Sequence, residues 1–121
     1  MEAQREPATL ISTSKVVGTD VYNTAGEALG DIYDVMVDKR SGKIAYAVMS
    51  FGGFLGIGTR YHPLPWSTLT YDPRKAGYVV PMSKEVLQRA PTVGADEGIW
   101  GDRVQEQTIH DYYKTRPYWD A

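Results

Sequence analysis

The chain has 121 residues, of which 42% are hydrophobic and 23% are charged, so it is large enough to bury one core and is predicted to form one globular domain. It contains no cysteine, which excludes disulfides, thiol nucleophiles and cysteine-based metal sites. The net charge is −2 and no basic stripe is present, which argues against nucleic-acid binding.

The predicted elements begin after a polar N-terminal segment. Residues 1–14 show no hydrophobic periodicity and are expected to form a flexible arm. The β-branched residues between Val16 and Tyr22 predict a first strand, and a second is predicted from about Gly30 to Asp38.

A hairpin is predicted at Arg40-Ser41-Gly42, since glycine adopts the left-handed conformation that such a turn needs. Asp38 is expected to cap this turn through its side chain, while Asp34 faces solvent.

The third predicted strand, Lys43 to Phe51, is apolar on both faces. Ile44, Tyr46 and Val48 alternate with Ala45, Ala47 and Met49. An ordinary surface sheet is apolar on one side only. One face of this strand should therefore fill a barrel interior, and the other should lie under a helix, a tail or another subunit.

Short elements follow in the second half of the chain. A fourth strand from Thr59 to Leu64 ends in a Pro65-Trp66-Ser67 corner, where we expect Trp66 to anchor the core. Two short strands flank a turn at residues 72–77. Ser83 is expected to cap a helix that ends near Arg89, and Asp102 a second helix that ends near Lys114. The pattern predicts a mainly β fold, a small closed or nearly closed barrel of about six strands.

Residues 30–69 also resemble a known family. The glycine-rich loop at 51–58, the Pro65-Trp66 corner, Asp34-Val35 and Asp38 are similar to the pattern of the PRC-barrel domain. This domain occurs in the photosynthetic reaction centre H subunit and in a bacterial ribosome-maturation factor. The resemblance covers residues 15–90 and implies a barrel that serves as an assembly or adaptor module, with residues 91–121 outside it as a helix and an extended aromatic tail.

No motif indicates catalysis, a cofactor or a metal. The glycine-rich loop lacks the Lys-Ser/Thr pair of a phosphate loop and is not followed by a helix. His62 and His110 are the only histidines, too few for a zinc site, and are expected to be surface or hydrogen-bonded residues. No nucleophile with a partnered base is visible, so the chain is predicted not to be an enzyme.

Aromatic residues near the C-terminus indicate a partner surface, because tyrosine and tryptophan are enriched at protein interfaces. Trp100, Val104, Thr108 and Tyr112 form a stripe on the second helix, and residues 116–119 should continue as an extended arm. The alternative is that this helix packs on its own barrel. The predicted interface comprises Phe54, Leu55, Ile57, Trp100, Val104, Thr108, Tyr112, Tyr113, Tyr118 and Trp119.

Together these observations predict a non-enzymatic, cytoplasmic interaction module that forms a homodimer or larger homo-oligomer and binds another protein. No stretch approaches the ~20 apolar residues of a membrane span, so membrane insertion is not expected. The alternatives are a small-molecule or cation sensor, or, by family analogy, a role linked to photosynthetic electron-transfer complexes or to ribosome maturation.

Overall fold

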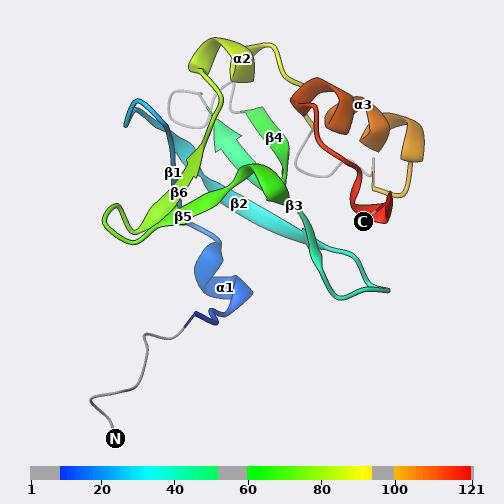
Figure 1. The fold of residues 1–121 in the computed structure, drawn as a ribbon, viewed down its shortest axis with the longest axis horizontal. Helices are drawn as coiled ribbons and strands as arrows, with labels where there is room; N and C mark the ends of the chain where they lie inside the picture. Colours follow the sequence, from blue (N-terminus) through cyan, green and yellow to red (C-terminus); the bar gives the residue numbers. More distant parts are fainter. Residues whose placement is uncertain (1–8, 52–59, 94–99, 121) are drawn as a thin grey trace, which may run out of the picture.

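The computed structural model describes residues 9–51, 60–93 and 100–120 (Figure 1). Six strands form one mixed sheet in the order β4-β3-β2-β1-β6-β5, which is not closed within the described residues. The strands are β1 (Asp20–Asn23), β2 (Ala28–Val37), β3 (Ile44–Phe51), β4 (Arg60–Pro65), β5 (Thr70–Asp72) and β6 (Gly77–Val80). The predicted mainly β fold of about six strands is confirmed, as an open sheet that resembles a barrel.

Neighbouring strands are antiparallel except for β1 and β6, which run parallel. The helices are short: α1 (Thr13–Val16), α2 (Lys84–Gln88) and α3 (Arg103–Tyr113), with 3-10 turns η2 (Trp66–Thr68) and η3 (Tyr118–Asp120). In Figure 1, α3 and the C-terminal end lie beside the β3–β4 side of the sheet, and α1 lies near the opposite edge. Among the described helices, none combines the length and apolar character needed to cross a bilayer.

The predicted strand at Val16 to Tyr22 is wrong in its first half. Ser12 caps α1 by accepting a hydrogen bond from the Ser14 backbone amide, and α1 ends at Val16. Gly18 has φ +91°, a conformation that breaks the extended path, so β1 begins only at Asp20. Local capping here overrides the β propensity of the two valines.

The predicted hairpin and helix caps are confirmed. Asp38 accepts hydrogen bonds from the Arg40 amide (3.2 Å) and the Ser41 hydroxyl (2.8 Å), and Gly42 has φ +77°. Ser83 accepts from the Val86 amide at the start of α2. Asp102 similarly accepts from the first amides of α3.

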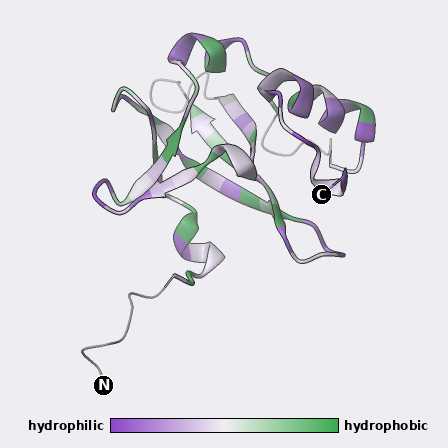
Figure 2. Ribbon diagram, viewed as in Figure 1, coloured by the Kyte–Doolittle hydropathy of each residue, from purple (hydrophilic) through white to green (hydrophobic). Residues whose placement is uncertain are grey.

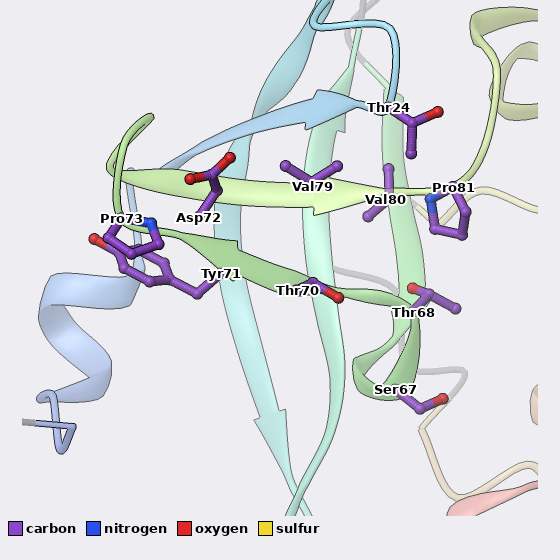
Figure 3. A pocket seen from close by; sticks show the side chains of 10 residues that line it. All are labelled: Thr24, Ser67, Thr68, Thr70, Tyr71, Asp72, Pro73, Val79, Val80 and Pro81. Atoms are coloured by element: carbon purple, nitrogen blue, oxygen red, sulfur yellow. The ribbon is translucent and has the colours of Figure 1, made fainter.

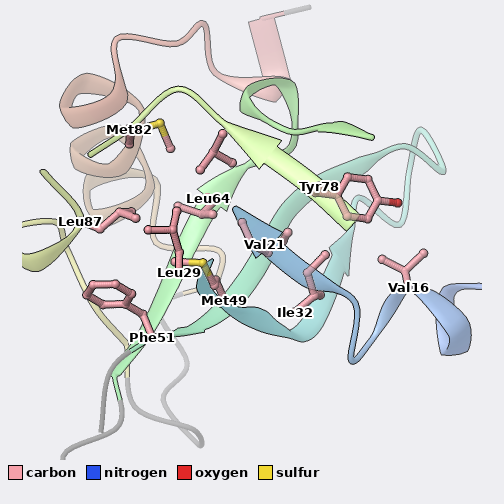
Figure 4. Close-up of a cluster of buried hydrophobic side chains, with 12 residues drawn as sticks. Val16, Val21, Leu29, Ile32, Met49, Phe51, Leu64, Tyr78, Met82 and Leu87 are labelled. Atoms are coloured by element: carbon pink, nitrogen blue, oxygen red, sulfur yellow. The ribbon is translucent and has the colours of Figure 1, made fainter. Parts of the chain in front are cut away.

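Both faces of β3 are buried, as predicted. Ala47, Met49 and Phe51 belong to the inner core, where side chains from the strands, α1 and α2 converge (Figure 4). Tyr46 and Val48 point to the other side of the sheet. Ala45 packs with Tyr46 and Val48 and not with Ala47. The reason is a register shift, because Met36 of β2 pairs with Tyr46 and the next residue, Val37, pairs with Ile44, so that Ala45 has no partner on β2.

Trp66 differs from the expected core anchor. Its side chain is half-buried at the border of the inner core, with its ring 5.5 Å from that of Tyr78. It is the first residue of the 3-10 turn η2, which follows the edge strand β4.

Candidate interaction surface

The C-terminal segment covers the outer face of β3. Ala45, Tyr46, Val48, Val93 and Ile109 form a second buried cluster, against which Met36, Tyr61, Trp100, Tyr113 and Tyr118 pack. We call these residues the outer cluster. The second apolar face of β3 is thus covered within the same chain, by α3 and the residues that follow it. Figure 2 shows that α3 carries mostly hydrophilic residues, in contrast to the hydrophobic positions along the strands.

The face of α3 that packs on the sheet is not the predicted stripe. Ile109, His110 and Glu106 are each 1% exposed and face the sheet, whereas Val104 is 78% exposed. A glutamate is rarely buried unless it is paired. The predicted stripe contains neither Glu106 nor His110. Their spacing of four residues, in line with Ile109 and Tyr113, is the signal that could have indicated a shared buried face.

The structure separates the predicted interface residues into three groups. Val104 and Thr108 are exposed on α3, and the Tyr112 hydroxyl donates to the Val86 carbonyl oxygen at the end of the same stripe. The half-buried aromatic residues contact the outer cluster or its neighbours; they are Trp100, Tyr113, Tyr118 and Trp119. Phe54, Leu55 and Ile57 lie outside the described residues.

A buried polar network joins α3 to β3. The Tyr46 hydroxyl donates to Glu106 Oε1 at 2.8 Å and lies 2.9 Å from His110 Nε2. Since the hydroxyl proton is given to the carboxylate, His110 donates from Nε2, and its Nδ1 lies 2.8 Å from the Thr115 hydroxyl. The Gly101 amide donates to Glu106 Oε2 at 2.9 Å. His110 is therefore a hydrogen-bonded structural residue, which is one of the two environments, surface or hydrogen-bonded, expected from the sequence.

Burial shifts the pKa of both aromatic members of this network. It raises the pKa of Tyr46 far above its usual range, and the hydrogen bond and negative charge of Glu106 add to this effect. Burial also lowers the pKa of His110 below 6.5, partly offset by the charges of Glu106 and Asp111. Both residues are thus uncharged near neutral pH.

The lowered pKa of His110 predicts a loss of stability in mild acid. The unfolded chain binds a proton at His110 more readily than the folded chain does. The contribution of His110 to the free energy of unfolding is therefore full above pH 6.5 and declines as the pH falls below that value. We expect the free energy of unfolding, measured with urea at pH 7.5 and pH 5.0, to fall less in His110→Gln than in the parent. An equal fall in both proteins would contradict the prediction.

The tail after α3 folds back, in contrast to the predicted extended arm. Lys114 ends the helix with φ 57°, Pro117 is buried, and residues 118–120 form η3. The Trp119 ring lies 5.6 Å from the ring of His110, and the Arg103 guanidinium stacks 4.3 Å above Trp119. The rings that were expected to reach a partner therefore pack largely on their own chain.

A separate groove of about 450 Å³ lies on the β5–β6 side of the sheet (Figure 3). Its lining includes hydroxyl groups from three different elements, and Asp72 and Val79 project from β5 and β6 between them. The hydroxyl-bearing residues are Thr24, Ser67, Thr68, Thr70 and Tyr71. Asp72 is already used by its own turn, because it accepts a hydrogen bond from the Arg74 amide at 2.9 Å.

Within the described ranges, no three histidine or acidic side chains gather in a way that could hold a metal ion. The sheet, the short α2 and the two buried clusters together define a small open β-barrel.

The family model for the PRC-barrel domain matches residues 8–87, more than half of the chain. The chain therefore belongs to the PRC-barrel domain family. No curated protein matches it. Both α3 and the tail lie beyond the matched residues.

Proposed function

We propose that this chain is a non-enzymatic protein-interaction module that associates with a second copy of itself through the solvent face of α3. Family membership supports an interaction role, because PRC-barrel domains often mediate protein interaction. The proposal includes a cytoplasmic location, since a chain without cysteine has no need of an oxidising compartment.

The observation that carries the proposal is the exposed stripe on α3. Val104 is 78% exposed although it lies in the first turn of a helix whose other apolar residues are packed. Thr108 and Tyr112 follow at intervals of four, and the stripe ends at Val86 of α2, which is also exposed. A two-fold axis near Thr108 would place Val104 of one copy against Tyr112 of the other, as an isologous contact requires.

Although β3 is apolar on both faces, it does not support an interface between copies, because α3 covers its outer face. Within the described residues, the proposal therefore places self-association on the exposed stripe of α3. This distinguishes two designs of variant: one that changes the stripe without touching the sheet, and one that removes the helix and uncovers Tyr46 and Val48.

We expect Val104→Glu to dissociate the oligomer while it leaves the fold intact, because the new charge would be buried against the second copy but exposed in a single chain. Light scattering coupled to size exclusion should give more than one chain mass for the parent and one for the variant. Gln107→Glu, which adds the same charge to α3 at a position outside the stripe, is the control. A parent that has the mass of one chain at micromolar concentration would refute self-association.

The groove on the β5–β6 side supports a second candidate function, the binding of a small polar ligand. Its volume of about 450 Å³ falls in the range of ligand sites, and its hydroxyl groups could fix a polar molecule. A thermal-shift screen against metabolites tests this candidate, since a ligand that binds only the native state raises the melting temperature. Thr70→Val should abolish the shift of any compound bound there.

A further inference from the structure

A smaller pocket, of about 70 Å³, opens where the β2–β3 hairpin meets the C-terminal segment. Three aromatic rings line it: those of Tyr46, Trp100 and Tyr118. The Tyr46 ring centroid lies 5.4 Å from that of Trp100 and 5.6 Å from that of Tyr118, and the latter pair meets edge to face. The wall of the pocket is therefore largely aromatic, a kind of surface that attracts cations.

The charged groups that line the pocket are both acidic. Asp38 comes from the hairpin and Glu106 from α3, and the described residues that line the pocket include no lysine or arginine. The hydrogen bond from the Ser41 hydroxyl, with the Arg40 amide, lowers the pKa of Asp38, which keeps this carboxylate ionised. The pocket therefore combines aromatic walls with negative charge.

Glu106 is buried without a cation beside it. Its carboxylate is 1% exposed and accepts hydrogen bonds from the Tyr46 hydroxyl and the Gly101 amide. Among the described residues, no lysine or arginine nitrogen lies within 4.0 Å of it. The nearest stacked cation, Arg103, lies over the rings of Trp119 and Tyr118 instead. A buried carboxylate is normally paired with a positive charge, and its field is little screened by water.

The acceptor capacity of Glu106 is also incomplete. A carboxylate has about four acceptor positions. Tyr46 and Gly101 fill two of these positions. One further donor can be accommodated, and the aromatic lining favours a donor that is positively charged.

We propose that this pocket binds an organic ammonium group, the head of a primary amine such as a lysine side chain. The cation lies against the rings of Tyr46, Trp100 and Tyr118, and the carboxylates of Asp38 and Glu106 balance its charge. The small volume selects a compact ammonium over a planar guanidinium. Aromatic rings attract a cation without coordinating it, so the lining suits an organic cation better than a metal ion, which needs oxygen or nitrogen ligands.

This site is separate from the surface proposed for self-association, because Val104, Thr108 and Tyr112 do not line it. Trp100, the fourth residue of the predicted stripe, lines the pocket but packs with the outer cluster and has no part in the proposed contact between copies. A monomeric protein would bind the amine equally well, and an oligomer that ignored the amine would refute only this site.

The test uses n-butylammonium chloride, which reproduces the end of a lysine side chain, and its neutral analogue butan-1-ol. Both are titrated into the full-length protein labelled with ¹⁵N, at constant ionic strength. We expect saturable shifts of the Gly101 amide and the Trp100 indole N–H signals with the ammonium, and affinity at least about tenfold weaker for the alcohol. Equal responses to both compounds, or no saturable shift, would show that the pocket holds only water and would overturn the proposal.

Variants on α3 test the role of charge. Glu106→Gln keeps the size of the side chain but removes the charge, and should weaken butylammonium binding by about tenfold. Asp111→Asn removes an exposed charge from the same helix and should leave the affinity within about twofold. An unchanged affinity in Glu106→Gln would overturn the proposal. Should that variant fail to fold, the comparison of the two probes in the parent still decides the matter.

A third arm identifies the source of the ammonium group. A blocked peptide with one central lysine, and the same peptide with norleucine in its place, are titrated in the same way. Binding of the lysine peptide about tenfold tighter than butylammonium would assign the pocket to a partner protein, and equal affinities would assign it to a free amine. Loss of binding in both the lysine peptide and butylammonium would contradict the site itself.

Discussion

Replacement of Ile109 by alanine is expected to lower the free energy of unfolding by about 2–5 kcal/mol, the usual cost of a truncated core side chain. Ile109 is 1% exposed and joins α3 to the outer face of the sheet. Equilibrium unfolding in urea, followed by circular dichroism, measures the effect. The prediction treats α3 as part of the folded core, although the helix lies beyond the residues matched by the family model.

Val104→Ala is the matched control, since it truncates an apolar side chain on the solvent face of the same helix. It should change the stability of the single chain by no more than about 0.5 kcal/mol. If Ile109→Ala were as mild as Val104→Ala, α3 would contribute little to the fold and could be removed without loss. The measurement should be made at low protein concentration, because self-association through Val104 would otherwise add its own effect.

Gly30→Ala is expected to destabilise the domain by about 3 kcal/mol or more, because there is no space for a side chain. A Cβ at this position would lie 1.9 Å from the Ser50 carbonyl oxygen of the neighbouring strand. That oxygen belongs to the backbone of β3, which is hydrogen-bonded to β2 on one side and β4 on the other. It therefore cannot move away without a large cost in free energy. The sheet would have to separate at this point.

Asp31→Ala is the control for Gly30→Ala, since it changes an exposed side chain at the next position of β2. Thermal unfolding should show a large decrease in melting temperature for Gly30→Ala and a small change for Asp31→Ala. A Gly30→Ala variant that melts within a degree or two of the parent would show that β2 and β3 can shift apart at little cost.

Sequence reasoning succeeded where structure depends on neighbouring residues. The hairpin at Asp38 and Gly42 and the caps at Ser83 and Asp102 each follow from hydrogen bonds within a few residues. The two buried faces of β3 were also predictable, because an uninterrupted apolar strand needs a cover on each side.

The candidate surface could be predicted only in part, because its polar members depend on residues far apart in the chain. Glu106 and His110 are buried since both hydrogen-bond to Tyr46 on β3, and no local pattern reveals that partner. The sequence pattern instead groups Val104 and Thr108 into a predicted partner interface and leaves packing of the helix on its own barrel as an alternative. The fold of the tail was not predicted for a similar reason. The tail turns back so that Trp119 packs on His110, and the proline in this segment does not by itself indicate such a turn.

The parallel pairing of β1 with β6 has a consequence for the order of folding. Hydrogen-bonded neighbours such as Tyr22 and Val79 are far apart in sequence, whereas β1, β2 and β3 each pair with the next strand along the chain. Contacts between distant residues require a large loop to close and form slowly. During synthesis the meander of β1 to β4 can therefore form early, while the other edge of β1 stays unpaired until β6 leaves the ribosome. Until then the inner core lacks one wall, and the nascent chain exposes the apolar surface that β6 and α2 later cover.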